Sequence, residues 1–359
     1  APVAPFELPA HYNRKATRSM GRVAVMGVRA SELALIDAGL LGDPLLSSGR
    51  LGISYGSSVG SPAAIGDFGN MISHKTTEGI TANTYIKMMS HTAAVNIGVF
   101  FGITGRIITT SSACTAGSQG IGYAFEAIQS GRQVAMLAGG AEELDAIDAA
   151  VFDTLFATST VNDTPHLTPR PFDAKRDGLV LGEGACTLVL EELGHAQARG
   201  ARILGEIIGF GTNSDGTHVT QPNARTMAQA MRLALDSAAV PPEAIGYVNA
   251  HGTATEHGDL AETNATAEVF GQRAPISSIK SYMGHTLGAC GALEAWMSLE
   301  MMRDGWFAPT INLTEVDARC GDLDYIGAGG RAIDTDIVMS NNFAFGGINT
   351  SLVLRRWQD

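Results

Sequence analysis

The sequence predicts an α/β protein in which helices cover mixed or parallel sheets. Short apolar runs rich in β-branched residues alternate along the chain with segments of helical spacing. Parallel strands need long crossover connections, which these intervening segments can supply. The 359 residues are 45% hydrophobic and 17% charged and include 43 glycines, a composition typical of a compact protein with a large core.

The elements are predicted from these patterns in chain order. In the first part we expect helices at 23–41, 117–131 and 193–201, with strands near 49–58, 106–113, 134–144, 178–192 and 203–211, and a loop rich in Thr, Pro and Asp at 158–178. Near residue 200 the pattern restarts, with a helix at 226–239, strand–loop–helix units at 245–270 and 275–302, and strand, glycine turn and strand at 336–356.

Charge and cysteine content exclude several classes of function. The net charge of −12 argues against nucleic acid or an anionic membrane surface as the main partner. The four cysteines form no C-x-x-C pair and no grouping with His at metal-ligand spacing, so we expect neither a metal site nor disulfides, and a reducing cytoplasm. No apolar run has membrane-spanning length, so we expect no membrane insertion. Because the chain opens "APVAPFELPA" without methionine, we expect a processed chain or a fragment.

Three predicted strand-to-helix junctions carry reactive side chains. Cys114 follows "TTSSA", His251 follows "GYVNA", and Lys280 to His285 follow "PISSI". In α/β sheets such junctions lie at the carboxyl ends of strands, where sites assemble. The three junctions are therefore expected to converge.

Cys114 has two interpretations on local grounds. It lies at the start of a predicted helix, where free N–H groups favour a thiolate, and the small residues around it would let a substrate approach. A free cysteine can equally be a small hydrophobic residue buried in the core. The local sequence leaves both open.

The neighbouring groups also have plain structural explanations. Lys280 and Glu294 flank His285 and could be a solvated lysine and an ordinary helix carboxylate. The two phenylalanines of the glycine turn "NNFAFGGINTS", Phe343 and Phe345, could fill the core or form a hinged flap.

Taken together, four blocks resemble a known family. "SSACTAGSQGIG", "NAHGTATEHGD", "SSIKSYMGHTLGACGALEA" and "MSNNFAFGGINTSLV" are similar, in this order, to the active-site blocks of β-ketoacyl-[acyl-carrier-protein] synthases of the elongating type I/II class. The segment "RPFDAKRDGLVLGEGACTLVLEE" resembles the link between that family's two halves. The resemblance runs from about residue 12 to the C-terminus.

The resemblance implies the thiolase fold, two pseudo-symmetric halves in five α/β/α/β/α layers. When the family's division is applied to this sequence, the N-terminal half covers 1–199 and the C-terminal half covers 200–359. The family's opening strand with a glycine motif has no counterpart in this sequence. The first strand of the N-terminal half is therefore expected to be absent, either because that segment lies outside this chain or because the first sheet is built differently. Family members dimerise by pairing sheet edges, which implies a homodimer.

The resemblance also implies a reaction without a cofactor. Cys114 would take an acyl group as a thioester, and His251 and His285 would stabilise the enolate formed when malonyl-carrier protein loses CO₂. The backbone N–H groups of Cys114 and Phe345 would form the oxyanion hole. Lys280 would position or polarise the region of His285, and Glu294 would anchor a polar network.

Further residues correspond to the family's binding elements. Thr253 and Thr255 would bind the phosphopantetheine arm of the acyl carrier protein, and Phe343 and Phe345 would form a gate. In "NRKATRSMG", a basic helix carrying Arg14, Lys15 and Arg18 would dock the acidic carrier protein, unless it is simply a solvated helix face.

Two alternatives within the superfamily remain at this point. The chain could form a heterodimer with a ketosynthase-like chain-length factor, or it could be a degradative thiolase, since Cys290 follows His285 by five residues. The sequence does not reveal whether the pathway makes fatty acids, polyketides or polyenes.

Overall fold

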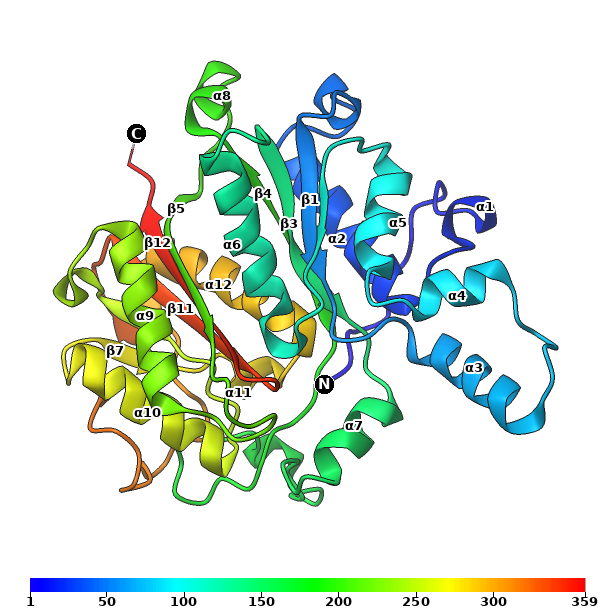
Figure 1. Ribbon diagram of the computed structural model, residues 1–359. Coiled ribbons are helices and arrows are strands. Elements are labelled where there is room, and N and C mark those ends of the chain that lie inside the picture. Colours follow the sequence, from blue (N-terminus) through cyan, green and yellow to red (C-terminus); the bar gives the residue numbers. More distant parts are fainter. Residues whose placement is uncertain (359) are drawn as a thin grey trace.

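The computed structural model describes residues 1–358 and contains two main sheets (Figure 1). The first sheet has the strand order β2-β1-β3-β4, in which β1 is parallel to β2 and β3 while β4 is antiparallel to β3. Its strands are β1 (Leu51–Gly56), β2 (Ile107–Thr109), β3 (Ala135–Glu142) and β4 (Gly184–Glu191). All residues of β1 are buried, as expected for a central strand covered on both faces.

The second sheet has the order β5-β12-β11-β6-β7-β9. Strands β11, β6, β7 and β9 are parallel, whereas β12 is antiparallel to both of its neighbours. The strands are β5 (Gly205–Ser214), β6 (Tyr247–Asn249), β7 (Pro275–Ser277), β9 (Asp324–Tyr325), β11 (Ile337–Ala344) and β12 (Ile348–Arg356).

The two sheets repeat one arrangement. Strands β2, β1, β3 and β4 follow each other as β7, β6, β11 and β12 do, with the last strand antiparallel in each case. The second sheet continues from β12 to β5, whereas within the described residues no strand continues the first sheet beyond β4. By this comparison, the strand that is missing beside β4 corresponds to the opening strand of the family, which the sequence predicts to be absent.

Helices complete five layers. Helices α6 (Ala116–Gln129) and α12 (Cys290–Asp304) lie between the sheets and contact both, as Figure 1 shows. Helices α2 (Arg22–Asp37) and α5 (Thr92–Phe101) cover the outer face of the first sheet, and α9 (Ala224–Ala238) covers that of the second, with α10 (Glu256–Phe270) beside it. The predicted five-layer α/β architecture is confirmed.

Glycines allow the two central helices to approach closely. A Cβ on Gly117 would lie 2.9 Å from the backbone nitrogen of Ala292, and one on Gly291 would lie 2.6 Å from the backbone nitrogen of Ser118. Both distances are shorter than real Cβ contacts, so only glycine fits there. This packing brings the start of α6 against the start of α12.

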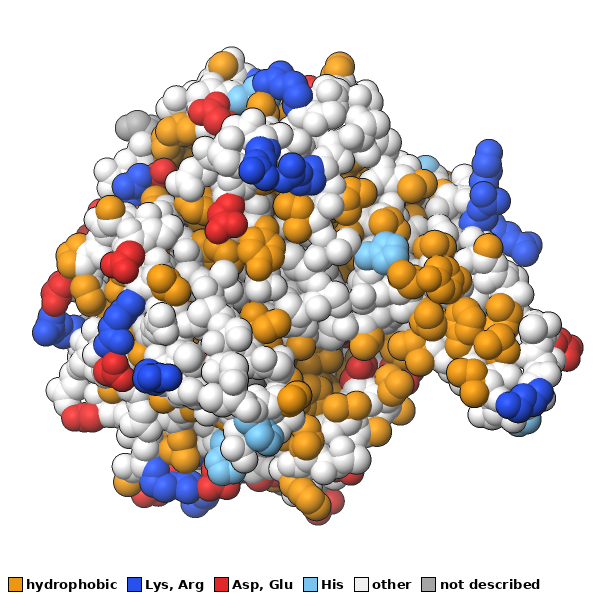
Figure 2. Space-filling view, in the orientation of Figure 1, with side chains coloured by type: hydrophobic (Ala, Val, Ile, Leu, Met, Phe, Trp, Pro, Cys, Tyr) orange, Lys and Arg blue, Asp and Glu red, His pale blue; other side chains and the backbone are white. Residues whose placement is uncertain are grey.

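An arm built from α3 (Pro62–His74) and α4 (Ala82–Met88) projects from the first half (Figure 1). Apolar side chains gather on the arm in Figure 2. Two large apolar residues of these helices, Ile72 and Tyr85, are exposed. The sequence patterns did not indicate these helices because Gly66 and Gly69 interrupt the apolar spacing of α3. The available signal was the Ser61-Pro62 pair, since proline is favoured in the first helical turn.

Two predicted elements were wrong in extent. The basic helix expected in 13–21 is only the four-residue α1 (Arg14–Thr17). The strand expected over 178–192 begins at Gly184, because the preceding residues make isolated bridges, Leu179 with Thr158 and Leu181 with His285.

The remaining elements are short. They are α7 (Ala146–Asp153), α8 (Leu193–Ala198), α11 (Lys280–Met283), β8 (Trp306–Phe307), β10 (Arg331–Ala332) and five 3₁₀ turns, η1 (Pro44–Ser47), η2 (Ala113–Thr115), η3 (Pro165–Leu167), η4 (Pro242–Ala244) and η5 (Leu287–Ala289). Across residues 1–358, no helix has both the length and the apolar character needed to cross a bilayer.

Candidate active site

Cys114 lies at the junction between β2 and α6, in the 3₁₀ turn η2. It is 5% exposed, and the preceding Ala113 has a left-handed φ of 51°. Burial raises the pKa of the Cys114 thiol to about 12, although the charge of Lys280 and the backbone N–H groups of Cys114 and Phe345 oppose this shift. In the resting site desolvation therefore outweighs the helix terminus.

His285 contacts the nucleophile directly. Its Nε2 atom lies 3.0 Å from Cys114 Sγ, and its Nδ1 atom accepts the backbone N–H of Leu287 at 3.3 Å. Because Nδ1 is an acceptor, the ring proton is assigned to Nε2. Burial and then the charge of Lys280 hold the pKa of His285 well below its usual value, so the ring is neutral at pH 7.

His251 faces His285 from the end of β6. The two ring centroids are 5.1 Å apart and the rings are nearly perpendicular. His251 Nδ1 lies 3.1 Å from Lys280 Nζ, so Nδ1 accepts and the proton is again assigned to Nε2. Burial, with Lys280 and His285 as further causes, keeps the pKa of His251 well below its usual value. The site thus presents two neutral imidazole N–H donors beside one thiol.

Lys280 and Glu294 form a buried ion pair behind the two rings. Glu294 also accepts a hydrogen bond from Asn342 Nδ2 at 2.6 Å. The sequence assigned Lys280 to the His285 region, but its direct imidazole contact is with His251. The reason is that the single turn α11 starts at Lys280 and directs this side chain toward the end of β6, whereas His285 follows the turn.

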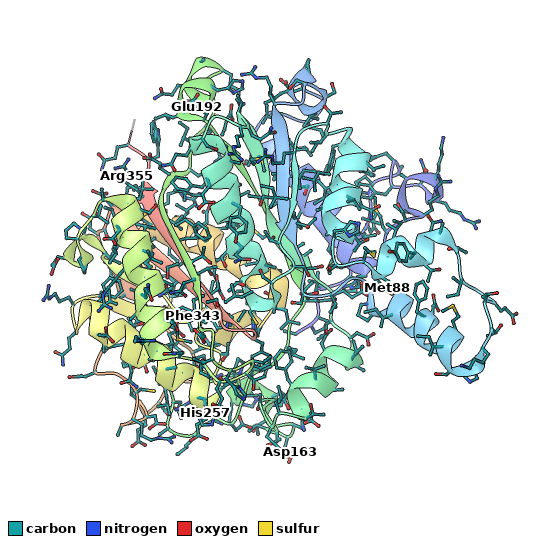
Figure 3. All side chains as sticks on the ribbon, in the orientation of Figure 1. Met88, Asp163, Glu192, His257, Phe343 and Arg355 are labelled. Atoms are coloured by element: carbon teal, nitrogen blue, oxygen red, sulfur yellow. The ribbon has the colours of Figure 1, made fainter. Side chains whose placement is uncertain are left out.

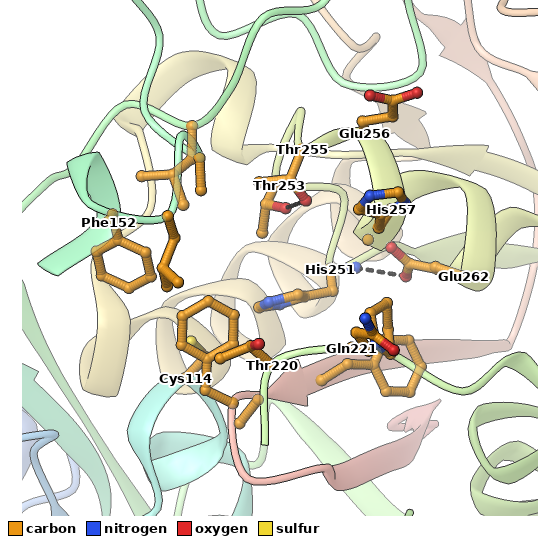
Figure 4. A pocket seen from close by; sticks show the side chains of 18 of the residues that line it. Cys114, Phe152, Thr220, Gln221, His251, Thr253, Thr255, Glu256, His257 and Glu262 are labelled. Carbon is orange, nitrogen blue, oxygen red and sulfur yellow. Dashed lines mark hydrogen bonds between the residues drawn. The ribbon is translucent and has the colours of Figure 1, made fainter. Parts of the chain in front are cut away.

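A cavity of about 500 Å³ leads to these groups. In Figure 4 the His251 ring lies beside Cys114, with Thr253 and Thr255 on one wall and Thr220 and Gln221 on another. All the predicted site residues except Lys280, Glu294 and the basic patch line this cavity: Cys114, His251, Thr253, Thr255, His285, Phe343 and Phe345.

The two phenylalanines differ in their surroundings. Phe343, labelled in Figure 3, is buried at the end of β11 and packs edge-on against His251. Phe345 lies in the glycine turn beyond β11, and its ring is 5.4 Å from that of Phe152 on α7. Phe345 is therefore the one next to Cys114, within an apolar cluster that also contains Leu179 and Leu181.

Two carboxylates hold the loop that carries the threonines. Asp259 accepts the backbone N–H groups of Thr253 and Ala254, both at 3.1 Å, and Glu262 accepts those of His251 and Gly252, both at 2.7 Å. Burial raises the pKa of Asp259 to about 6 and that of Glu262 to about 8.

Arg176 reaches the same loop from the first half. Its guanidinium donates to the carbonyl of Glu256 at 3.2 Å and to Asp317 at 2.8 Å. Sequence reasoning missed Arg176, Asp259, Glu262, Asn342 and Phe152, because nothing in a single sequence distinguishes such residues from surface charges and core fillers.

The remaining candidates lie apart from the cavity. Arg14, Lys15 and Arg18 are exposed around α1 and do not line the cavity, and in Figure 1 the arm of α3 and α4 lies between α1 and α7. Cys290 is fully buried and its Sγ donates to the carbonyl of Cys114 at 3.3 Å, so it is not open to substrate.

The site also has donors that could hold a metal ion. The sulfur of Cys114 and one ring nitrogen each of His251 and His285 lie within 4.8 Å of one another. The sequence predicted that the three junctions converge, but it predicted no metal site, because these donors have no metal-ligand spacing along the chain.

Comparisons with known proteins cover nearly the whole chain. Residues 4–196 match the family model "Beta-ketoacyl synthase, N-terminal domain", and residues 204–314 match "Beta-ketoacyl synthase, C-terminal domain". The chain is 38% identical over 352 residues to 3-oxoacyl-[acyl-carrier-protein] synthase 1 of Escherichia coli K12, covering 97% of this chain and 85% of the relative.

Solved structures of ketosynthases superpose on nearly the whole chain. A β-ketoacyl synthase from Burkholderia phymatum STM815 superposes with a TM-score of 0.98 at 63% identity, covering 100% of this chain and 88% of that one. The ishigamide ketosynthase/chain length factor superposes with a TM-score of 0.89 at 32% identity, covering 99% of this chain and 87% of that one. The predicted fold is confirmed by these neighbours.

Proposed function

This chain belongs to the β-ketoacyl synthase family, and we propose that it joins an acyl group held on Cys114 to a malonyl group delivered by acyl carrier protein. The observation that supports this proposal best is the contact of 3.0 Å between His285 Nε2 and Cys114 Sγ. A second imidazole, that of His251, lies beside this pair. The reaction is a decarboxylative Claisen condensation of fatty acid or polyketide elongation, and it uses no resident metal or cofactor.

In the first half-reaction Cys114 Sγ attacks the carbonyl carbon of the incoming acyl thioester. The thiol proton passes to the departing carrier thiolate, so the carrier leaves as a free thiol. The N–H group of His285 and the charge of Lys280 stabilise the thiolate that develops at Sγ. Because the resting thiol has a raised pKa, ionisation is coupled to substrate binding.

In the second half-reaction the malonyl thioester oxygen accepts the Nε2 protons of His251 and His285. The C–C bond to the carboxylate breaks, CO₂ leaves, and the electron pair forms an enolate that these two donors stabilise. The carbanion attacks the acyl carbonyl on Cys114, whose oxygen is held by the N–H groups of Cys114 and Phe345. The C–S bond then breaks, its electrons return to Sγ, and the thiolate takes a proton from solvent, which restores the resting thiol.

Lys280 and Glu294 prepare the site without touching substrate. Lys280 donates to His251 Nδ1 and thereby keeps the proton on Nε2, while Glu294 compensates the buried ammonium. Thr253 and Thr255, whose hydroxyls lie 2.9 Å apart, face the cavity and bind amides of the phosphopantetheine arm. Phe345, with Phe343 behind it, gates the passage to Cys114.

The acyl carrier protein is the partner that this chemistry requires. The E. coli relative is named for the carrier that bears its substrates. The exposed basic residues around α1 (Arg14, Lys15 and Arg18) give a patch of the sign that an acidic carrier prefers. Since α1 lies away from the cavity of its own chain, this patch would assist a carrier that spans a larger surface.

We also propose that the chain forms a homodimer. Strand β2 is the edge of the first sheet and leaves one side of its backbone unpaired, with Ile107 40% exposed. The arm of α3 and α4 exposes further apolar side chains. A second copy that pairs at β2 would cover both. The ishigamide neighbour is a ketosynthase with a chain length factor, so a heterodimer is the alternative partner arrangement.

Intact-mass measurement tests the proposal. The protein is incubated with an acyl-carrier protein and then with malonyl-carrier protein. We expect an acyl adduct on the wild-type protein, none on the Cys114→Ala variant, and a β-ketoacyl-carrier product only when both substrates are present. An adduct that persists on Cys114→Ala would contradict the role of Cys114.

The His285→Ala variant separates the two half-reactions. Losing one donor to the enolate is expected to lower malonyl decarboxylation by about 10²- to 10³-fold. Acylation of Cys114 should remain detectable, because the nucleophile and the oxyanion donors are intact. Unchanged release of CO₂ would show that the role of His285 is misplaced.

A further inference from the structure

The turn that follows His285 is held by a side chain from the first half of the chain. This turn is η5, which leads into α12. The N–H of Gly288 lies at this helix start, where N–H groups have no partner within the helix. It donates to Glu142 Oε2 at 2.9 Å. The same oxygen accepts the N–H of Ser58 at 2.7 Å, so one carboxyl ties the turn to the loop after β1.

Glycines let β3 and the turn approach each other closely. A Cβ on Gly140 of β3 would lie 2.1 Å from the carbonyl oxygen of Gly288, and a Cβ on Gly288 would lie 2.8 Å from Cα of Ser57. Both distances are shorter than real Cβ contacts. The turn is therefore clamped between the ends of β1 and β3, and Glu142 supplies the side-chain hydrogen bond of this contact.

This turn decides which nitrogen of His285 carries the proton. The N–H of Leu287 donates to His285 Nδ1 at 3.3 Å, which leaves the ring proton on Nε2. Leu287 has a left-handed φ of 46°, a conformation that a residue with a Cβ keeps only where its surroundings hold it. The hydrogen bond to the ring is long, so it is lost easily when the turn moves.

Glu142 itself does not face the substrate. It is fully buried and is not among the residues that line the cavity. Any influence of this carboxyl on the orientation of His285 therefore passes through the turn.

We propose that Glu142 is a positioning residue, which fixes the turn after His285 and thereby keeps the His285 proton on Nε2, where the malonyl thioester oxygen accepts it. This inference rests on the proposed function. The first half of the chain then supplies the nucleophile and also the orientation of one enolate donor in the second half.

A double-variant cycle tests whether Glu142 acts through His285. Glu142→Met has a side chain of similar length but lacks the strong acceptor. We expect the kcat of CO₂ release from malonyl-carrier protein to fall about 10- to 100-fold. The KM should stay unchanged, because Thr253 and Thr255 are untouched. In the His285→Ala background the same change should add less than about twofold, because the group that Glu142 positions is already gone.

Glu142→Gln is the rescue variant. Its amide oxygen can accept both N–H groups. Burial raises the pKa of Glu142 to about 7, so the uncharged amide resembles the protonated carboxyl. This variant should recover most of the CO₂ release that Glu142→Met loses.

Glu143→Met is the matched control. Glu143 is the next residue and is also buried, but it accepts the N–H of Val23 at 2.9 Å and the hydroxyl of Ser61 at 3.3 Å. Its loss should lower the free energy of unfolding, as Glu142→Met does, because buried N–H groups lose their acceptor in both variants. The control should leave CO₂ release unchanged, since neither partner belongs to the turn.

Hydrogen exchange of the wild-type protein gives a readout that does not depend on whether Glu142→Met folds. The amides of Leu287 and Gly288 should exchange as slowly as those of the central strand β3, because the clamped turn opens only with the core. The same protection should persist in Glu142→Gln.

Three results would overturn the proposal. They are an equal loss of CO₂ release in the wild-type and His285→Ala backgrounds, no recovery in Glu142→Gln, or fast exchange of the two turn amides in the wild-type protein. If the wild-type protein neither releases CO₂ nor forms a condensation product, the proposed function fails instead. Hydrogen exchange still reports whether the turn is clamped, so the two failures are distinguishable.

Discussion

Lys280 Nζ lies 3.1 Å from His251 Nδ1, and both side chains are buried. The ammonium lowers the pKa of His251, and it also lowers the pKa of the Cys114 thiol. One cation therefore keeps an imidazole neutral and opposes the cost of forming a buried thiolate. Its own charge is held by the carboxylate of Glu294.

Replacing Lys280 should move the acidic limb of the decarboxylation pH profile upward. Without the ammonium the pKa of His251 rises, so the ring takes up a proton at higher pH and the neutral form is lost earlier on acidification. The measurement is CO₂ release from malonyl-carrier protein between pH 5 and pH 8 in Lys280→Met.

The matched control is the double variant Lys280→Met with Glu294→Gln. A lone buried carboxylate destabilises by about 3–5 kcal/mol, and the second change removes that charge. The shift of the acidic limb should persist in the double variant while thermal stability recovers. A limb that returns to the wild-type position would mean that Glu294, and not Lys280, sets the pKa of His251.

The sequence predicted that the three strand-to-helix junctions converge, and the structure brings Cys114, His251 and His285 together. The sequence did not suffice for their pairing or ionisation. Lys280 is adjacent to His285 in the chain, yet it contacts His251, because a single helical turn decides its direction. Cys114 starts a helix, yet burial controls its pKa.

Larger features were missed for a related reason. The arm of α3 and α4 and the carboxylates under the threonine loop are set by tertiary packing. Asp259, for example, accepts N–H groups from Thr253 and from the distant Phe172. No local periodicity encodes such contacts.

Alkylation of Cys114 should report its raised pKa. With the pKa at about 12, the thiolate fraction rises about tenfold per pH unit across the whole accessible range. The rate of reaction with iodoacetamide should therefore increase from pH 6 to pH 10 without reaching a plateau. Peptide mapping follows the label, and Cys114→Ser is the control that removes it. A plateau near pH 7 would show a preformed thiolate.

The contact between α6 and α12 should not tolerate an added methyl group. In Gly291→Ala the Cβ would meet the backbone nitrogen of Ser118 at 2.6 Å, so the helices must separate. We expect a loss of about 1–3 kcal/mol in the free energy of unfolding, measured in urea, together with lower condensation activity. The starts of these helices hold Cys114 and the turn after His285.

Gly66→Ala is the comparison for this helix contact. Gly66 lies in α3 with open space where the Cβ would be built. Alanine there should raise the free energy of unfolding by about 0.5–1 kcal/mol, since glycine costs that much in a helix interior. If both variants change stability in the same direction, close packing is not what selects glycine at position 291.

Glu142 should make stability fall as pH rises. It is buried at the end of β3, and its Oε2 atom accepts the N–H groups of Ser58 at 2.7 Å and Gly288 at 2.9 Å. Burial raises its pKa to about 7, from 4.5 for the exposed group. Between these two pH values the folded state binds more protons than the unfolded state, so the free energy of unfolding decreases with rising pH.

The Glu142→Gln variant isolates this contribution. Its amide oxygen can accept both N–H groups, and it does not titrate. Measured by urea unfolding from pH 4.5 to pH 8, the variant should gain stability relative to wild type as pH rises, by at most about 3 kcal/mol, and the gain should level off above pH 7. A difference that stays constant across this range would mean that Glu142 ionises near its ordinary pKa, and that its two backbone hydrogen bonds fully offset its burial.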